Sequence, residues 1–400
     1  VQELIDKPDY TPETNKVLVG LYNFKDPALL KESLEQQYKK IRGELQLSSM
    51  IEYYISKRKI KGMLIKSWVD TGTLEDYNQA LKKNLSGRSF NKFVLDDFGT
   101  LTKTSSYSKL QSEIKWLKKI SNDETLSPLI PKFYSSTVNG DEISYKTEYL
   151  NGTSLAEYFM FYDIKDCNWV YIFNQLLKSG NLMWRKKAPR TAPNIKELTK
   201  YMYLDKTLER IKKWERKDIM KENIINCNGE KLYSFNKLLE PLKKRIQNLI
   251  DTSPKYYSII HGDPCFSNVL YFPSASTFKF LDPRGNFGVD TIYGDCRYDI
   301  AKTRHCYHGL YDYITQGLYD LKEISSNCFE YNFLTNNLLS PAIFDEMIER
   351  QGYNINDIEL IEGLLFISMI PLHSEDKNAQ IMYYLTGLRC LNNQLKDEIK

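Results

Sequence analysis

Short apolar runs rich in β-branched and aromatic residues mark the middle of the chain. Three of them lie close together, at 255–260, 269–272 and 278–281, and this composition is typical of strands. The run at 93–103 surrounds a turn and predicts two strands. Another run, at 143–150, ends at Asn-Gly, which is a turn signal. The pattern therefore predicts several short strands separated by turns.

Other segments repeat apolar residues at helical spacing, with Lys-rich outer faces in two of them. Thr153 or Ser154 can cap a helix that follows the Asn-Gly turn. The remaining predicted helices are 110–120, 194–215 and 235–250, and the run 305–400 holds further helical patterns, including 358–370 and 379–395. Strands followed by many helices predict an α+β protein whose second part is largely helical.

Polar residues fill the turns between the strands. Residues 261–268 read His-Gly-Asp-Pro-Cys-Phe-Ser-Asn, and Asp282 follows Asn268 by fourteen residues. Phosphoryl transfer needs a carboxylate to orient and deprotonate the attacking hydroxyl, and oxygen ligands that hold Mg²⁺ on the ATP phosphates. We therefore predict Asp263 as the base and Asn268 and Asp282 as metal ligands. Each motif alone is equally typical of an ordinary turn, but their order and spacing together favour a small-molecule kinase.

These motifs resemble those of the aminoglycoside phosphotransferase and choline kinase superfamily, in which His-Gly-Asp-x-x-x-x-Asn precedes a metal-binding Asp. Residues 293–302, Tyr-Gly-Asp-Cys-Arg-Tyr-Asp-Ile-Ala-Lys, look like that family's Gly-Asp-Pro-x-Tyr-Asp-Leu-Ala segment. The resemblance covers about residues 84–400. It implies a two-lobed, protein-kinase-like α+β fold that uses ATP and Mg²⁺. It also implies that His261 belongs to the catalytic loop and that Asp299 braces this loop.

The same resemblance implies a nucleotide site. Lys103 and Glu113 match the kinase pair of a strand lysine and a helix glutamate that fixes ATP. The alternative is an exposed pair on solvated elements. Backbone groups near Glu148, Tyr149 and Leu150 resemble the hinge that pairs with adenine, although a hairpin without a ligand would look similar.

Two features depart from the kinase pattern. No Gly-x-Gly-x-x-Gly loop occurs, and the candidate phosphate-covering turn at 84–91 has one glycine. Asp282 is followed by Pro-Arg-Gly, which brings Arg284 close to the chemistry. A guanidinium suits phosphate or an anionic substrate, so we assign Arg284 to the catalytic site. The alternative is a surface arginine at the rim.

The N-terminal part resembles a different family. Residues 65–80 contain Trp-Val-Asp-Thr-Gly-Thr, similar to the Trp-x-Asp-x-Gly-Thr signature of sugar-1-phosphate nucleotidyltransferases, and Asp-Lys-Pro at 6–8 resembles that family's Glu-Lys-Pro. The resemblance implies that Asp70 binds Mg²⁺ and that Lys7 contacts a sugar phosphate. The alternatives are a strand-end turn for Asp70 and a loop lysine for Lys7.

The Gly-rich loop with which that family begins is missing from the sequence. We therefore expect either a piece of a longer bifunctional protein or a transferase remnant kept for packing, and no nucleotidyl transfer by residues 1–83 alone. The expected organisation is a partial α/β nucleotidyltransferase-like segment at 1–83, a kinase N-lobe at 84–150 and a helical C-lobe at 151–400.

Composition agrees with a cytoplasmic enzyme. The 55 basic and 51 acidic residues nearly balance, which argues against a nucleic-acid or membrane partner. No run of eighteen apolar residues and no signal peptide is visible. The seven cysteines form no Cys-x-x-Cys pair and are expected to be reduced thiols. The sequence leaves the oligomeric state open and is compatible with a homo-oligomer.

The acceptor is the least determined part of the prediction. An aromatic cage for choline or ethanolamine needs several rings, and the candidates are Trp169, Tyr307, Tyr311 and Tyr313. The alternative is that these rings belong to the core, which is the more common place for aromatic residues in a helical lobe. The sugar-type N-terminal segment favours a sugar or polyol instead, whose phosphate ester would supply a nucleotide-activated precursor for a surface (capsule) polysaccharide; this rests on analogy. A non-enzymatic binding protein on a kinase-like fold is the third alternative. Protein kinase activity is disfavoured, because no activation segment of the Ala-Pro-Glu kind follows Asp282.

Overall fold

The computed structural model describes residues 91–335 and 340–399 throughout. Nearer the N-terminus it describes residues 19–36, 38, 40, 43, 45–65, 68–69, 71–73, 75–76 and 79–80. The chain divides into two compact units, residues 1–85 and 86–400, and each is described by itself.

The smaller unit contains two described helices, α1 (Pro27–Leu34) and α2 (Leu47–Lys57). Asp26 caps α1, because its carboxylate accepts a hydrogen bond from the Leu29 N–H, and it also pairs with Arg58 at 2.9 Å. Tyr54 of α2 is buried and meets the ring of Phe24 edge-on, with 5.2 Å between centroids. Lys7 and Asp70, the two residues predicted to bind sugar phosphate and metal, lie outside the described residues.

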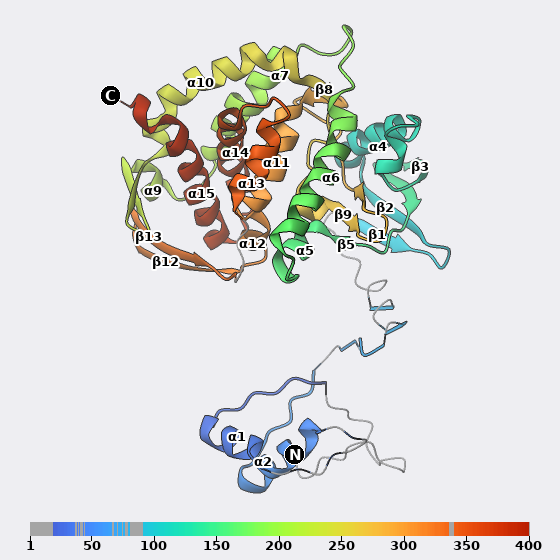
Figure 1. Ribbon diagram of the computed structural model, residues 1–400, viewed down its shortest axis with the longest axis vertical. Helices are drawn as coiled ribbons and strands as arrows, with labels where there is room; N and C mark the ends of the chain where they lie inside the picture. Colours follow the sequence, from blue (N-terminus) through green and yellow to red (C-terminus); the bar gives the residue numbers. More distant parts are fainter. Residues whose placement is uncertain are drawn as a thin grey trace. The chain divides into compact units, whose positions relative to one another are not determined.

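The larger unit begins with a four-stranded antiparallel sheet in the order β1-β2-β4-β3. Its strands are β1 (Lys92–Leu95), β2 (Thr100–Ser106), β3 (Phe133–Asn139) and β4 (Glu142–Glu148). Helix α4 (Tyr107–Ser121) follows β2 and contacts three of these strands, as Figure 1 shows in cyan and teal. Its buried face includes Leu110, Ile114, Leu117 and Ile120, which recur at helical spacing within the predicted helix 110–120. This sheet and helix form the N-lobe.

Two smaller sheets lie next in the chain. One has the order β10-β9-β5 and the other joins β11 to β8. The strands are β5 (Thr153–Ser154), β8 (Tyr257–Ile259), β9 (Val269–Phe272), β10 (Thr277–Phe280) and β11 (Tyr293–Asp295). The loop after β8 contains 261–268, including the short 3₁₀ helix η3 (Phe266–Asn268), and the loop after β10 contains Asp282. The predicted strand at 255–260 begins two residues late, because the preceding helix continues to Tyr256.

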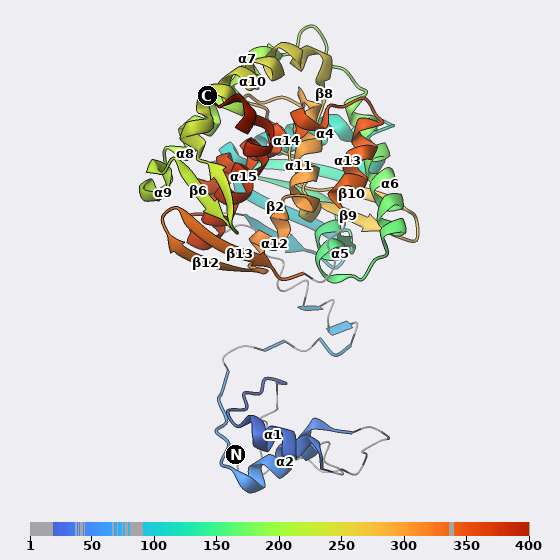
Figure 2. The ribbon, with the colours of Figure 1, turned by 60° about the vertical axis from the view of Figure 1, so that its left-hand side comes forward.

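The rest of the C-lobe is mainly helical. Helix α14 (Ile355–Met369) is its centre, since every residue from 358 to 369 is buried. It packs against α11 (Cys296–Tyr307) and α15 (Lys377–Leu395) (Figure 2). The helices are α5 (Leu155–Phe161), α6 (Asp166–Trp184), α7 (Ile195–Lys200), α8 (Lys206–Ile211), α9 (Lys217–Lys221), α10 (Phe235–Tyr256), α11 (Cys296–Tyr307), α12 (Tyr311–Thr315), α13 (Pro341–Glu349), α14 (Ile355–Met369) and α15 (Lys377–Leu395). Ser154 is the cap predicted for the first of these helices, through a capping box with Glu157.

The predicted helix at 194–215 is interrupted. Between α7 and α8 the backbone forms a turn of π-helix, η2 (Tyr201–Asp205), which widens the helix by one residue per turn. The interruption rotates the residues that follow it relative to those before it. Periodicity alone did not indicate this change.

The run 305–400 contains helices near the two predicted segments, and it also contains two strands that were not predicted. A hairpin of β12 (Tyr319–Ser325) and β13 (Cys328–Phe333) occupies part of it and joins β6 (Ile224–Cys227) and β7 (Glu230–Tyr233) in a sheet ordered β12-β13-β6-β7. The sequence contained a signal for half of this sheet, because Asn228-Gly229 between β6 and β7 is a typical hairpin turn. The pairing of β13 with β6, about a hundred residues earlier, had no local signal.

The described residues of the larger unit therefore form the predicted α+β fold, with a first lobe built on a sheet and a largely helical second lobe. All seven cysteines are free thiols. Among the described residues, no helix is both long and apolar enough to cross a membrane.

Candidate active site

Asp263 lies in the loop after β8 and is partly buried. Its Oδ1 is 2.9 Å from Nζ of Lys302, which projects from α11. Burial alone would raise the pKa of Asp263, but the charges of Lys302 and Arg284 outweigh this effect and hold the pKa well below its ordinary range. Asp263 is therefore an ionised carboxylate, the form in which it can accept a proton.

His261 is completely buried beneath this loop. Its Nδ1 accepts a 3.3 Å hydrogen bond from the Asp263 N–H, and its ring lies edge-on to Trp116 of α4, with 5.5 Å between centroids. Burial lowers the pKa of His261 to about 4, so the ring is neutral near pH 7. The side chain of His261 therefore supports the backbone of the loop 261–268 and does not reach solvent.

Asp299 of α11 forms hydrogen bonds to the backbone of the same loop. Its Oδ2 accepts a 2.8 Å hydrogen bond from the His261 N–H and its Oδ1 accepts one of 2.8 Å from the Gly262 N–H. Trp184 Nε1 donates a third, at 3.2 Å. Burial raises the pKa of Asp299 to about 6, and these donors act against the rise. Asp299 therefore holds two successive backbone N–H groups of the loop 261–268.

Asn268 and Asp282, the predicted metal ligands, come from adjacent loops that are bonded to each other. Asn268 Nδ2 donates a hydrogen bond to the backbone carbonyl of Asp263 at 3.0 Å. The backbone carbonyl of Asn268 accepts a hydrogen bond from the Leu281 N–H at 2.8 Å. This leaves the amide Oδ1 of Asn268 available. Asp282 is exposed and has a left-handed backbone with φ 52°, an uncommon conformation outside glycine that concentrates at functional sites. A carboxylate and an amide oxygen are ligands that fit Mg²⁺.

Lys103 connects the N-lobe to the loop that carries Asp282. Its Nζ lies 2.9 and 3.0 Å from the two carboxylate oxygens of Glu113 and 3.0 Å from Oδ1 of Asp282. Tyr145 donates its hydroxyl to Glu113 at 2.5 Å. Burial raises the pKa of Glu113 to about 7 while the Lys103 ammonium opposes the rise. The Lys103 and Glu113 side chains are only 4% and 10% exposed, so they are not the solvated surface pair of the alternative interpretation.

Arg284 is partly buried and is not a rim arginine. Its N–H donates to the His261 carbonyl at 2.9 Å, and its Nη1 donates to the Tyr298 hydroxyl at 2.6 Å. The loop is tight here, since a Cβ on Gly262, which has φ 84°, would lie 2.7 Å from Cβ of Arg284. The structure brings Arg284 to the same loop as Asp263.

Gly285 allows the loop that carries Asp282 to lie close against α4. It has φ 60°, and a Cβ there would lie 2.0 Å from the Ser112 carbonyl oxygen. We expect Gly285→Ala to push the loop off α4 and lower turnover on the order of 10²-fold, because small misplacements of reacting groups have effects of this size. Gly140→Ala is the matched control: its φ is 59° and a Cβ there would meet nothing within 4 Å. Equal turnover in the two variants would refute this role.

Glu148, Tyr149 and Leu150 lie where β4 leads towards β5, at the join of the lobes. The Tyr149 N–H donates to the Gly99 carbonyl at 2.7 Å, and the Glu148 N–H donates to the Lys132 carbonyl at 3.0 Å. Both of these donors are therefore engaged within the protein. Pairing of this segment with adenine stays a prediction. The candidate phosphate-covering turn lies outside the described residues apart from Asn91.

Sequence reasoning missed two lysines near the catalytic loop. Lys302 ends the quoted 293–302 motif three residues after Asp299, a helical spacing that places both on one face of α11 and offered a signal. Lys206 lies in the Lys-rich pattern at 194–215, where a lysine normally faces solvent, so it gave none. Of the aromatic cage candidates, Trp169, Tyr307 and Tyr313 are buried in the core.

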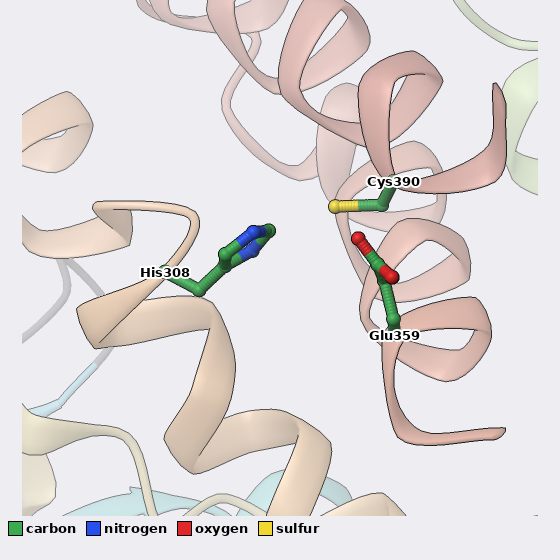
Figure 3. Close-up of side chains that lie close together, drawn as sticks. All are labelled: His308, Glu359 and Cys390. Atoms are coloured by element: carbon green, nitrogen blue, oxygen red, sulfur yellow. The ribbon is translucent and has the colours of Figure 1, made fainter. Parts of the chain in front are cut away.

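A second group of side chains has the composition of a metal site. Figure 3 shows His308, Glu359 and Cys390 turned toward one another, with ligand atoms within 4.8 Å. Arg304 already supplies positive charge here: its Nη1 lies 3.9 Å from Glu359 Oε1 and pairs more closely with Glu362. Burial also raises the pKa of the Cys390 thiol well above its ordinary value, which disfavours a thiolate ligand. The group is explained as a buried ion-pair network.

Comparison with known proteins separates the two units. A family model described as nucleotidyl transferase matches residues 1–87. None of the curated proteins matches the chain.

Among solved structures, an aminoglycoside phosphotransferase from Streptomyces rimosus in complex with ADP and streptomycin is 12% identical, with a TM-score of 0.42, over 80% of this chain and 99% of that one. The gentamicin complex of APH(2'')-IIa is 14% identical, with a TM-score of 0.44, over 79% and 96%. Choline kinase from Cryptosporidium parvum is 13% identical, with a TM-score of 0.40, over 82% and 98%.

Both resemblances that the motifs indicated are thus found. A nucleotidyl transferase family model matches residues 1–87, and the similar solved structures include aminoglycoside phosphotransferases and a choline kinase.

Proposed function

We propose that the larger unit is an ATP-dependent, Mg²⁺-requiring phosphotransferase that acts on a hydroxyl of a sugar or polyol. One observation carries the proposal: an ionised carboxylate, Asp263, shares a pair of bonded loops with Asn268 and Asp282. Asp282 is in turn joined to the buried Lys103–Glu113 pair. These are the groups that phosphoryl transfer requires, drawn from both lobes.

The chemistry follows from the position of each group. Asp263 accepts the proton of the acceptor hydroxyl, whose oxygen forms a bond to the γ-phosphorus of ATP while the bond to the β,γ-bridging oxygen breaks and ADP leaves. Lys103 donates hydrogen bonds to phosphate oxygens, with Glu113 fixing its orientation. Mg²⁺ bound by Asn268 and Asp282 would neutralise phosphate charge. Asp299 and His261 keep the loop in place.

The N-terminal match supports a bifunctional protein, in which the kinase product is a phosphate ester that a nucleotidyl transferase can activate. Within that proposal Lys7 contacts the sugar phosphate and Asp70 a metal ion. The enzyme is cytoplasmic and supplies a nucleotide-activated precursor for a surface polysaccharide. The same match favours a sugar or polyol over choline. The burial of Trp169, Tyr307 and Tyr313 points in the same direction, because a cage must expose its rings to the ligand.

We expect ADP release from Mg-ATP in a panel of sugars, polyols, choline, ethanolamine and amino acids to be stimulated by one acceptor class. The stimulated release should stop when EDTA removes Mg²⁺ and return when excess Mg²⁺ is added, because the carboxylate and amide ligands bind ATP phosphates through the metal. A coupled spectrophotometric assay of ADP measures this. Acceptor-stimulated release that persists in EDTA would contradict the proposed roles of Asn268 and Asp282.

A further inference from the structure

Lys206 is a buried lysine at the start of α8. The residue is 7% exposed, and its Nζ has a polar contact with Met202 Sδ at 3.6 Å. Among the described residues, no carboxylate lies within ion-pair distance of it. A buried ammonium without a carboxylate is strongly unfavourable. Burial, followed by the charges of Arg284, Arg210 and Lys302, lowers the pKa of Lys206 well below its ordinary range.

The neighbouring cations have few negative partners. Arg284 bonds to the neutral Tyr298 hydroxyl, and Arg210 bonds to the Ser368 carbonyl at 3.2 Å. Burial and the charge of Arg284 lower the pKa of Arg210, with exposed Glu209 acting weakly in the other direction. Lys302 is paired, but its partner is the catalytic carboxylate Asp263. The charges of Arg284, Arg210 and Lys302 therefore all act on Lys206, and the charge of Asp263 acts on it in the opposite direction.

The backbone just before Lys206 has an unusual conformation and contacts the neighbours of Arg284. The π-helical turn η2 directly precedes Lys206, and such turns are often found at functional sites. Tyr203 from this turn is buried and lies parallel to Tyr298, with 6.3 Å between ring centroids. Tyr298 in turn accepts the hydrogen bond from Arg284. One chain of contacts thus links the turn that carries Lys206 to the loop that carries Asp263.

We propose that Lys206, Arg210, Arg284 and Lys302 form an oxyanion site beside Asp263, and that the acceptor hydroxyl belongs to a molecule carrying a phosphate or carboxylate group. This inference rests on the proposed phosphotransferase function. An oxyanion would supply the negative charge that Lys206 and Arg210 lack, and a guanidinium is suited to bind it. A cationic acceptor such as an aminoglycoside or choline would be repelled by the same charges. The site therefore selects an anionic sugar or polyol derivative.

Binding of inorganic phosphate tests the site directly. Protein saturated with Mg-ADP, which occupies the nucleotide site, is titrated with phosphate in a calorimeter. We expect Lys206→Met to weaken phosphate binding by about 10- to 100-fold, the usual effect of removing one charged hydrogen bond, and to leave Mg-ADP binding unchanged. Methionine fills the buried space without a charge, so this variant should melt no lower than wild type in the absence of phosphate.

Lys213→Met is the matched control, because Lys213 is exposed and lies seven residues further along the chain. It should bind phosphate like wild type. Phosphate binding that is unchanged in Lys206→Met, or absent in wild type, would overturn the oxyanion site.

Turnover distinguishes phosphate from carboxylate and tests the acceptor class. The acceptors compared are glycerol with glycerol 3-phosphate, glucose with glucose 6-phosphate and with glucuronate, and choline. We expect an anionic member to give the higher kcat/KM, with Lys206→Met removing its advantage over the neutral parent. ADP release stimulated best by glycerol, glucose or choline would leave the kinase proposal standing and overturn this inference. Lys206-dependent phosphate binding without ADP release for any acceptor would support the oxyanion site and count against the kinase.

Discussion

Replacing Asp263 by asparagine is expected to lower kcat by on the order of 10²–10⁴, the contribution typical of a positioned general base. Asparagine keeps the size of the side chain but cannot accept the hydroxyl proton as a carboxylate does. Mg-ATP affinity should remain nearly unchanged, because the proposed nucleotide contacts come from Lys103 and the metal ligands. Steady-state kinetics and calorimetric titration of ATP measure the two quantities.

Two further observations test the assignment of the base. Asp320→Asn, an identical change at an exposed position of β12, should retain wild-type turnover. Because Lys302 and Arg284 hold the pKa of Asp263 below its ordinary value of 3.8, the wild-type rate should not fall through its protonation anywhere above that pH. Wild-type turnover in Asp263→Asn would exclude Asp263 as the base.

Replacing Arg297 by leucine is expected to destabilise the larger unit by about 3–5 kcal/mol, the usual consequence of removing one partner from a buried ion pair. Arg297 has no exposed surface and donates hydrogen bonds to Asp295, including one of 2.7 Å from Nη2. It also binds Asp357 at 3.0 Å and stacks on Tyr256, with 4.2 Å between its guanidinium carbon and the ring centroid. The substitution leaves Asp295 buried without a countercharge.

Urea unfolding followed by circular dichroism measures this effect. Arg350→Leu is the matched control: Arg350 pairs with Glu346 on the surface of α13, and both side chains are well exposed. Losing such a pair should change stability by less than about 1 kcal/mol. The same midpoint in both variants would refute the structural role of Arg297.

Arg297 lies at the start of α11, the helix that carries Asp299 and Lys302 of the candidate site. Asp295 caps α11 by accepting a hydrogen bond from the Arg297 N–H at 3.1 Å, and Asp299 and Lys302 lie on the same helix. A disturbance at the start of α11 would therefore reach the brace and the cation that contact the catalytic loop. We place Arg297 among the residues that position the site, since it has no surface with which to touch a substrate.

Much of the local structure was predictable because it depends on neighbours in the sequence. The apolar stripe at 110–120 specified the buried face of α4, and the run at 269–272 coincides with β9. The His-Gly-Asp motif and Asp282 were identified because their residue types match the chemistry of phosphoryl transfer at a suitable spacing. The proposed oxyanion site was not predictable, since Lys206 resembles any surface lysine until the fold buries it.

The sequence by itself determined the α+β class, most of the elements and the residues that carry the proposed chemistry, because side-chain periodicity and short motifs are local properties of the chain. Only the tertiary structure decided which distant residues meet. Lys103 contacts Asp282 across 179 positions, and β13 pairs with β6 to form a sheet that no local pattern indicated. The charges around Lys206 likewise come from separate helices and a loop. Burial and electrostatic interaction depend on distance in space, and spacing along the chain does not specify that distance.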